Sequence, residues 1–414
     1  MLHGKYYRMR VFPWNSERSP EQVNRVQEAT GDLTLNREKR YELGRVGLLG
    51  YRKGTPSFPY TLRQYENGDM SFFRALANKE DPATASEDNT IDLDDLSTTK
   101  SDIAAFLTEE DGVTFAGTVI IPRLRVTGFS INIGNPDAEI ERNISLIGED
   151  YKVFDGKYFA YYTDDVATGE ETKVITFGGT GEPIVPIAYE TDTFIFRVLR
   201  IRDTEVFELT EGTGDDEWQY SDASKELTIA DCGVGDTIKV YYCSDEAYDT
   251  LWENEDVQED FLLAEDCEIF IKINATGHSE ARVYRLQSIG IDVTLERTDY
   301  KEIGNSEVVQ TGVKAKTVKV SLDRFAEDFS LEDILQDDNS NILIDPRKFS
   351  ENIELLVKVY KEKTHENFKI AFKITDLTPM TTNIAQKVEE YQSRTTTLES
   401  DNISISDDST ELFL

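Results

Sequence analysis

RVQEATGDLTLNREKRYELGR, residues 25–45, returns as RLQSIGIDVTLERTDYKEIGN, residues 285–305, without a gap and at one offset, 285 − 25 = 260. Apolar positions fall on apolar positions across the match, and chance rarely keeps one register over so long a stretch. We therefore predict a duplicated domain. The signature of the repeat comprises Asp32, Leu35, Arg37 and Gly44 in the first copy and Asp292, Leu295, Arg297 and Gly304 in the second.

The repeated stretch predicts a fixed order of elements. Residues 32–36, DLTLN, alternate polar and apolar side chains with the period of a half-buried strand. The charged REK and YELG that follow predict a short turn of helix closed by glycine. A hairpin arm at Val46–Pro59, a strand at 60–65 and a helix at 70–76 complete the unit. We expect residues 25–76 and 285–335 to superimpose.

Two segments interrupt this plan. Residues 78–112 are acidic and poor in aromatic residues, which predicts a long surface loop. Between the copies, strand-like runs separated by turns predict a small inserted β-sandwich, which we expect outside the assembly and dispensable for it. These runs are residues 172–177, 193–201, 205–209, 218–220, 226–229 and 237–242.

The expected fold is mainly β. It contains two sandwich or half-barrel domains, each with a short helix and a long hairpin arm, and the inserted β domain between them. We place the first copy at residues 1–160, the insert at 161–262 and the second copy at 263–414.

The net charge of −36 over 414 residues argues against a protein that grips nucleic-acid phosphates or an anionic membrane surface. No apolar signal segment and no transmembrane run is visible. Cys232, Cys243 and Cys267 are too few for a disulfide scaffold, so free thiols in a reducing cell are expected. A bridge between Cys232 and Cys243 across one hairpin remains an option.

Catalytic and metal-binding patterns are weak. His3, His278 and His365 have no companion motif, which favours surface or structural histidines and predicts that the chain is not an enzyme. The acidic runs at 92–95 and 215–217 lack the spacing of a calcium loop, so solvated loops are expected. No cofactor or metal is predicted.

The linked features resemble the tail tube proteins of long-tailed bacteriophages, in a form with two fused tube domains. They are LTLNREKRYELGR, the hairpin arm, the following helix and closing strands ending in ISLIGED, with VTLERTDYKEIGN, SLEDIL and TTTLESD in the second copy. The resemblance covers most of the chain outside the insert. It implies a structural virion protein, the major tail tube subunit, assembled in the host cytoplasm. Its rings of three chains, with pseudo-six-fold symmetry, stack into a tube that conducts DNA from the capsid to the host cell.

The implied partners are further copies of the chain, together with tape measure, tail terminator and tail tip proteins. DNA would pass through the bore without specific binding, and the chain itself would bind no membrane. An acidic bore that repels DNA and simple solubility both explain the negative charge. One alternative is a tail-tip or baseplate hub ring of the same fold. Another is a β-rich module that binds a host surface through exposed Trp218, Tyr220, Tyr241 and Tyr242.

The arms, Val46–Pro59 and Val308–Lys319, are predicted to make the contacts between successive rings. An isolated hairpin is marginal in water, so each arm needs a partner surface to become ordered. The apolar side chains expected at these contacts are Leu48, Leu49, Phe58, Val308, Val309 and Val313.

Overall fold

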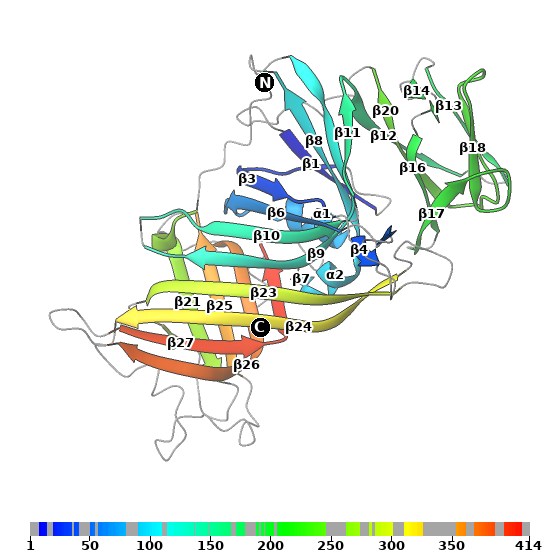
Figure 1. Cartoon of the computed structure of the whole chain (residues 1–414). Coiled ribbons are helices and arrows are strands. Elements are labelled where there is room, and N and C mark those ends of the chain that lie inside the picture. The colour runs from blue at the N-terminus through cyan, green and yellow to red at the C-terminus, as the bar shows by residue number, and fades with distance from the viewer. Residues whose placement is uncertain are drawn as a thin grey trace, which may run out of the picture.

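A computed structural model describes residues 8–14, 20–34, 37–40, 50–53, 57–79, 90–109, 114–135, 137–148, 150–166, 171–178, 188–189, 192–193, 195–202, 205–245, 262–273, 281–283, 286–300, 310–325, 353–361, 368–385 and 393–407. Strands dominate these segments and confirm the mainly β fold (Figure 1). None of the helices described is long and apolar enough to cross a membrane.

Within the residues that the structure describes, the first copy contains eleven strands and two short helices. The strands are β1 (Arg8–Pro13), β2 (Glu21–Gln22), β3 (Val26–Gly31), β4 (Arg37–Arg40), β5 (Gly50–Lys53), β6 (Phe58–Tyr65), β7 (Ile91–Asp92), β8 (Ser101–Thr108), β9 (Phe115–Ile133), β10 (Glu141–Gly148) and β11 (Lys152–Asp155). The helices are α1 (Ser71–Ala77) and α2 (Leu93–Thr98).

The second copy contains the 3-10 turn η2 (Ala264–Asp266) and strands β21 (Cys267–Ile273), β22 (Ala281–Arg282), β23 (Leu286–Tyr300), β24 (Gln310–Phe325), β25 (Ile353–Tyr360), β26 (Phe368–Ala385), β27 (Ser393–Ser400) and β28 (Asn402–Ser406). The insert contains β12 (Tyr158–Asp165), β13 (Lys173–Thr176), β14 (Ala188–Tyr189), β15 (Asp192–Thr193), β16 (Ile195–Arg202), β17 (Glu205–Glu211), β18 (Glu217–Ser221), β19 (Glu226–Ile229) and β20 (Thr237–Ser244).

Four strands of each copy join in one antiparallel sheet of eight strands, which we call the spanning sheet. Its order is β3–β6–β10–β9–β23–β24–β27–β26 (Figure 1). Each copy adds an outer sheet, β2–β1–β8–β9–β11 or β22–β21–β25–β26–β28. The apolar core lies between the sheets, and α1 and α2 contribute to it.

The long strands β9 and β26 belong to both sheets of their copies because each one bends. At the bend stands a left-handed residue that is not glycine, Arg123 with φ 53° and Asp376 with φ 55°. Such a backbone costs free energy unless the surroundings hold it. In the first copy they do, since the carboxylate of Asp102 accepts the Arg123 amide at 2.8 Å.

The strand registers reproduce the sequence repeat. The pair Val26↔Gln64 of β3 and β6 becomes Leu286↔Arg324 of β23 and β24, and a β-bulge follows both pairs. At the far end of the hairpin, Arg40↔Gly50 becomes Tyr300↔Gln310. Since a one-residue slip would turn every side chain to the opposite face, this agreement confirms the duplicated hairpin. The helix expected at 329–335 lies outside the described residues.

Two local predictions are wrong. Residues 37–40 form β4, because they pair with β5 and continue the hairpin, although Arg, Glu and Lys favour a helix in isolation. Residues 78–112 are not one loop, since they contain β7, α2 and β8. The carboxylates of Asp92 and Asp95 form a capping box at the start of α2, and Ser101–Thr108 is buried almost throughout. The acidic average composition of this segment concealed all three elements.

The insert forms a seven-stranded sheet in the order β12–β20–β16–β17–β18–β19–β13. All six strand-like runs are confirmed as strands, and β12 begins at Tyr158. The side chains of Trp218, Tyr241 and Tyr242 are buried, and Tyr220 packs against the insert core. The alternative function, a module that binds a host surface, therefore lacks the exposed aromatic residues on which it was based. The three cysteines are free, so the Cys232–Cys243 bridge is absent.

The insert is docked on the outer sheet of the first copy by an apolar cluster. Strands β12, β16 and β20 contribute Phe159, Leu199 and Tyr241, which join Phe12 and Phe106 of the first copy. Phe12 meets Phe159 and Tyr241 edge to face, with ring centroids 4.9 and 5.8 Å apart. The insert thus covers apolar side chains that would otherwise face water.

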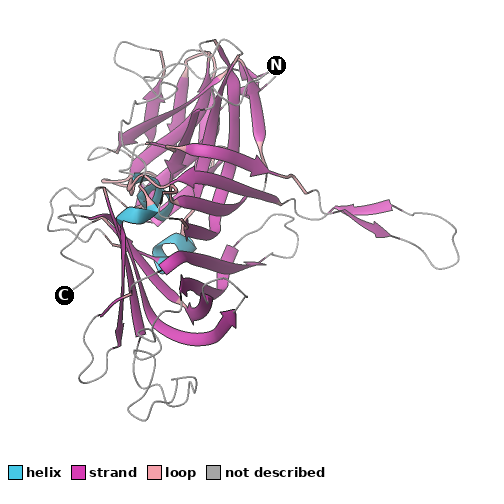
Figure 2. Ribbon diagram, turned by 90° about the vertical axis from the view of Figure 1, so that its left-hand side faces the viewer, coloured by secondary structure: helices cyan, strands magenta, loops and turns pink. Residues whose placement is uncertain are grey.

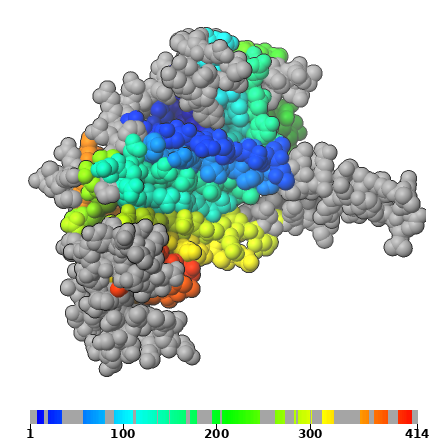
Figure 3. Space-filling view, turned by 60° about the vertical axis from the view of Figure 1, so that its left-hand side comes forward, coloured from blue at the N-terminus to red at the C-terminus, as the bar shows by residue number. Residues whose placement is uncertain are grey.

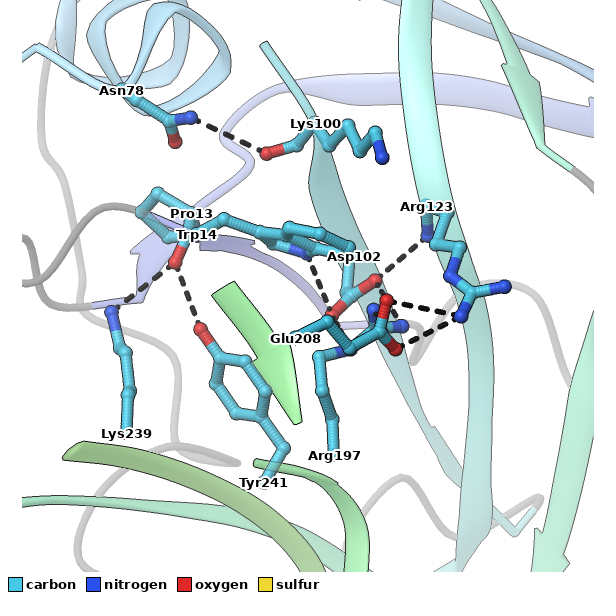
Figure 4. A network of polar contacts seen from close by, with 10 residues as sticks. All are labelled: Pro13, Trp14, Asn78, Lys100, Asp102, Arg123, Arg197, Glu208, Lys239 and Tyr241. Carbon is cyan, nitrogen blue, oxygen red and sulfur yellow. Dashed lines mark hydrogen bonds and ion pairs between the residues drawn. The ribbon is translucent and has the colours of Figure 1, made fainter. Parts of the chain in front are cut away.

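A buried polar network crosses the same interface (Figure 4). Arg197 of β16 forms an ion pair with Asp102 of β8 at 3.2 Å, and the indole of Trp14 donates to the same carboxylate. Burial raises the pKa of Asp102, while the charge of Arg197 opposes that rise. Arg197 also pairs with Glu208 at 2.9 Å, and Arg123 donates to Glu208 as well. Removing one partner would leave a buried charge uncompensated.

Lys239, at the edge of this network, makes the stability of the protein depend on pH. Its ammonium is fully buried and donates to the Pro13 carbonyl at 3.2 Å, which Tyr241 also contacts. Burial lowers the pKa of Lys239 to about 7, although the charge of Asp102 partly opposes the fall. The unfolded chain keeps this proton up to about pH 10.4. Folding therefore releases a proton above pH 7, and the unfolding free energy rises with pH in that window.

We expect Lys239→Met to remove this dependence. The wild-type thermal midpoint should rise from pH 7 to pH 9, whereas the variant, which has no buried amine, should not show this rise. At pH 6 the variant should unfold at the higher temperature, because no charge is buried. Calorimetry over this range measures both effects, and equal pH slopes for the two proteins would contradict the assignment.

Candidate assembly interface

The two copies meet at a strand joint in the middle of the spanning sheet. Strand β23 of the second copy pairs with β9 of the first, from Ile289↔Ile133 to Thr294↔Gly128. A Cβ atom at Gly128 would lie 2.2 Å from the Val293 carbonyl oxygen, which is closer than any Cβ tolerates. Glycine therefore permits the close approach of the two backbones at this end of the joint.

Arg297, one of the signature residues, clamps the joint where the paired ladder ends. Its guanidinium donates to the carbonyls of Val126 at 2.8 Å, Ser97 at 2.8 Å and Leu96 at 3.4 Å. The carbonyls of Leu96 and Ser97 belong to the last turn of α2, where helix carbonyls lack intrahelical partners and favour a cation. The internal repeat singled out Arg297, but its role depends on a helix that the sequence did not reveal.

Further contacts reinforce the joint. Strand β28 pairs with β7, and Arg74 of α1 holds Asp407 through two bonds of 2.8 and 2.7 Å. Lys316 forms an ion pair with Asp94. The acidic run at 92–95, expected to be a solvated loop, therefore starts a helix and binds the second copy.

The spanning sheet ends in two edges. Strand β3 pairs only with β6, and residues 381–385 of β26 pair only with β27, among the strands that the structure describes. The side chains at 31–34 are exposed, Asp32 and Leu33 among them. Because the amides of Asp32 and Thr34 donate toward β6, those of Gly31 and Leu33 point away from the sheet. This edge can accept another strand.

The two edges are equivalent to the two sides of the joint. At the offset of 260, β3 corresponds to β23. The pairs of β10 with β9, such as Ser145↔Gly128, recur between β27 and β26, where the equivalent pair is Thr397↔Thr381. Strand β26 therefore corresponds to β9. A β26 edge and a β3 edge can meet as β9 and β23 do.

The face of the spanning sheet that points away from the core carries more carboxylates than basic groups, with Glu28, Glu141, Asp292, Asp323 and Glu399 against Arg63 and Lys319. Lys319 lies between Asp292 and Glu399 on neighbouring strands, and Arg63 pairs with Glu141. In Figure 3 the strands of the two copies form adjacent bands, blue to cyan-green and yellow. The other side chains along the pairing rows are mainly Thr61, Asn143, Ser145, Ser130, Asn132, Thr294, Thr317, Ser321 and Thr397.

Of the first arm, predicted at Val46–Pro59, the structure describes Gly50–Lys53 and residues 57–59. Gly50–Lys53 is β5, which pairs with β4 in a ribbon that stands well clear of the body in Figure 2. Phe58, expected as an exposed contact, is instead buried at 6% exposure and stacks on Tyr60, because it begins the core strand β6. Val313 in β24 is partly buried against the main core. The other expected contact residues, Leu48, Leu49, Val308 and Val309, lie outside the described residues.

Some of the remaining signature residues are described by the structure, and others are not. Leu295 is buried in the joint strand, and Asp292 is exposed beside it. Leu35, Gly44 and Gly304 lie outside the described residues, as do all three histidines. In the part of the chain that the structure covers, no three His, Cys, Asp or Glu side chains gather as metal ligands.

Comparison with known proteins gives little. No protein-family model matches the chain, and no curated protein matches it. Among solved structures, a chain from the cryo-EM structure of the anti-feeding prophage baseplate, 6-fold symmetrised, matches with 14% identity and a TM-score of 0.24. The match covers 36% of this chain and 91% of that chain. A score this low transfers neither fold nor function, so function has to be argued from the joint and the edges.

Proposed function

We propose that the protein is a structural subunit of a phage-type tail tube, and that its chains join edge to edge into closed rings. One observation carries the proposal: the spanning sheet contains the β9–β23 joint and ends in two edges equivalent to its two sides. Contacts of this head-to-tail kind continue until the rotation closes. Closure would pair both edges of the spanning sheet, which removes the hazard of open strands there.

Three chains would place six equivalent copies in a ring, and the outward face of the spanning sheet would line the bore. Hydroxyl and amide side chains there offer DNA no cationic surface to hold it. The β4–β5 ribbon would contact the neighbouring ring, so that rings stack. The role is structural, with no catalytic step, and the tape measure, terminator and tip proteins of such a tail would be its partners.

A tail-tip or baseplate hub ring is the second candidate, because the same edges would close it. The two candidates differ in stacking. A tube subunit makes rings that stack through the arms, whereas a hub makes one ring. The projecting ribbon favours stacking, since an isolated two-stranded hairpin needs a partner surface for stability.

Electron microscopy with mass photometry tests this function. The wild type should form trimeric rings and tubes. Leu33→Pro removes an outward amide from the β3 edge and should leave single chains, while Leu33→Ser keeps the amide and should still form rings. Replacing residues 38–53 with a short Gly-Ser turn should give rings that do not stack. A wild type that stays monomeric at high concentration would refute the proposal, and wild-type rings that never stack would favour the hub.

A further inference from the structure

The in-chain joint also specifies the contact between neighbouring chains, an inference that rests on the proposed function. At the joint, Asp292 pairs with Ser130. The equivalent of Asp292 is Asp32, and the equivalent of Ser130 is Asn383, because Asn143↔Ser130 recurs as Thr395↔Asn383.

We infer that β3 of one chain pairs antiparallel with β26 of the next in the register Thr30↔Ala385, Gly31↔Ile384 and Asp32↔Asn383. Arg37 is the equivalent of Arg297. By the same equivalence we assign as its acceptor the carbonyl of Pro379 of the next chain, which holds the place of Val126. The occupant of each edge is therefore a second copy of this chain, and the contact continues the sheet already present within it.

The chemistry of the two edges suits this pairing. The paired positions carry one charge among them, that of Asp32, although the whole chain has a net charge of −36. Like charges placed opposite each other on neighbouring strands are destabilising, so strands that must meet need an uncharged border. An edge of Thr, Gly, Asn, Ile and Ala lets two strongly negative chains approach.

The contact between chains is shorter than the joint within a chain. Thr381 occupies the place of Gly128, where a Cβ atom would lie 2.2 Å from the carbonyl of the facing strand. The strands must separate at that point, so the last bond of the ladder is the one that the amide of Leu33 donates. With the ladder shortened, Arg37 becomes the anchor beyond its end.

Cross-linking tests the register. Asp32→Cys combined with Asn383→Cys places two thiols on one face of facing strands, within the reach of a disulfide. Mild oxidation of rings should give covalent dimers and trimers on a denaturing gel. Asp32→Cys with Thr382→Cys is the matched control, because neighbouring residues of a strand point to opposite faces. Each single variant controls for the native thiols, of which Cys232 and Cys243 are buried.

Arg37→Ala tests the clamp. It should weaken ring formation about tenfold or more and leave the thermal midpoint of the isolated chain unchanged. Arg297→Ala should lower that midpoint, because its contacts are within the chain. Rings that cross-link through the Thr382 pair would overturn the register while the proposed function stands. Rings of Arg37→Ala with wild-type affinity would overturn the clamp. Absence of rings in the wild type would remove the proposed function itself.

Discussion

Gly128→Ala is expected to lower the thermal midpoint by about 1–4 °C, because one methyl group placed at the joint collides with backbone. The added Cβ would lie 2.2 Å from the Val293 carbonyl oxygen, and a carbonyl fixed in a ladder cannot rotate away. Either β9 and β23 separate or the ladder bonds distort. Overpacking of this kind typically costs about 1–3 kcal/mol.

Gly290→Ala is the matched control. Gly290 lies in the same ladder, opposite Asn132, and a Cβ atom there would meet the Asn132 side chain at an ordinary 3.6 Å. Both substitutions remove the same backbone freedom from the unfolded chain, so their difference isolates the collision. Hydrogen exchange of β9 and β23 locates the damage. Equal midpoints for the two variants would show that the joint tolerates a wider spacing.

The duplicated hairpin could be predicted from the sequence because identities and apolar positions recorded its register. The pairing of β3 with β6 and of β23 with β24 follows from the repeat alone, because β6 and β24 occupy equivalent positions in it. The same reasoning failed at residues 37–40, where the preference of Arg, Glu and Lys for helices is weaker than pairing with a distant strand. Local sequence patterns indicate local conformational preference, whereas the conformation of residues 37–40 is determined by their pairing with β5.

The joint lay beyond the reach of the sequence for a different reason. Arg297 was recognisable as a repeated residue, but the carbonyls it binds come from α2, in a segment read as a loop. Gly128 showed no signal, since its equivalent in the second copy is Thr381. Contacts between copies depend on which strands become neighbours. That choice is made by tertiary packing rather than by periodicity.

The outer sheets of the two copies differ at the positions that the insert covers in the first copy. Where the first copy has Phe12 opposite Asp102, the second has Lys272 opposite Glu354. Lysines also replace two other side chains of the docking cluster, Lys358 at the place of Phe106 and Lys373 at the place of Ile120. The second copy has no insert over this face, and its lysines are at least partly exposed. The apolar face of the first copy is therefore matched to the domain that covers it.

Deleting residues 158–245 should consequently give an aggregating chain, even if the insert takes no part in ring contacts. The deletion uncovers Phe12, Phe106 and Ile120 and leaves Asp102 without Arg197. Fully burying each large apolar side chain contributes about 1.5–3 kcal/mol, and exposed patches of this kind promote association.

The lysines of the second copy indicate which substitutions should restore solubility after that deletion. Phe12→Lys, Phe106→Lys and Ile120→Lys in the shortened chain install the side chains that keep the equivalent face soluble, with Asp102 now opposite a lysine as Glu354 is. Light scattering should show aggregation of the bare deletion and a soluble protein after the three substitutions, and microscopy should show rings. The full-length chain with the same three lysines should be destabilised, because they would be buried under the insert. A soluble shortened chain that forms no rings would show that the insert contributes to the contact between chains.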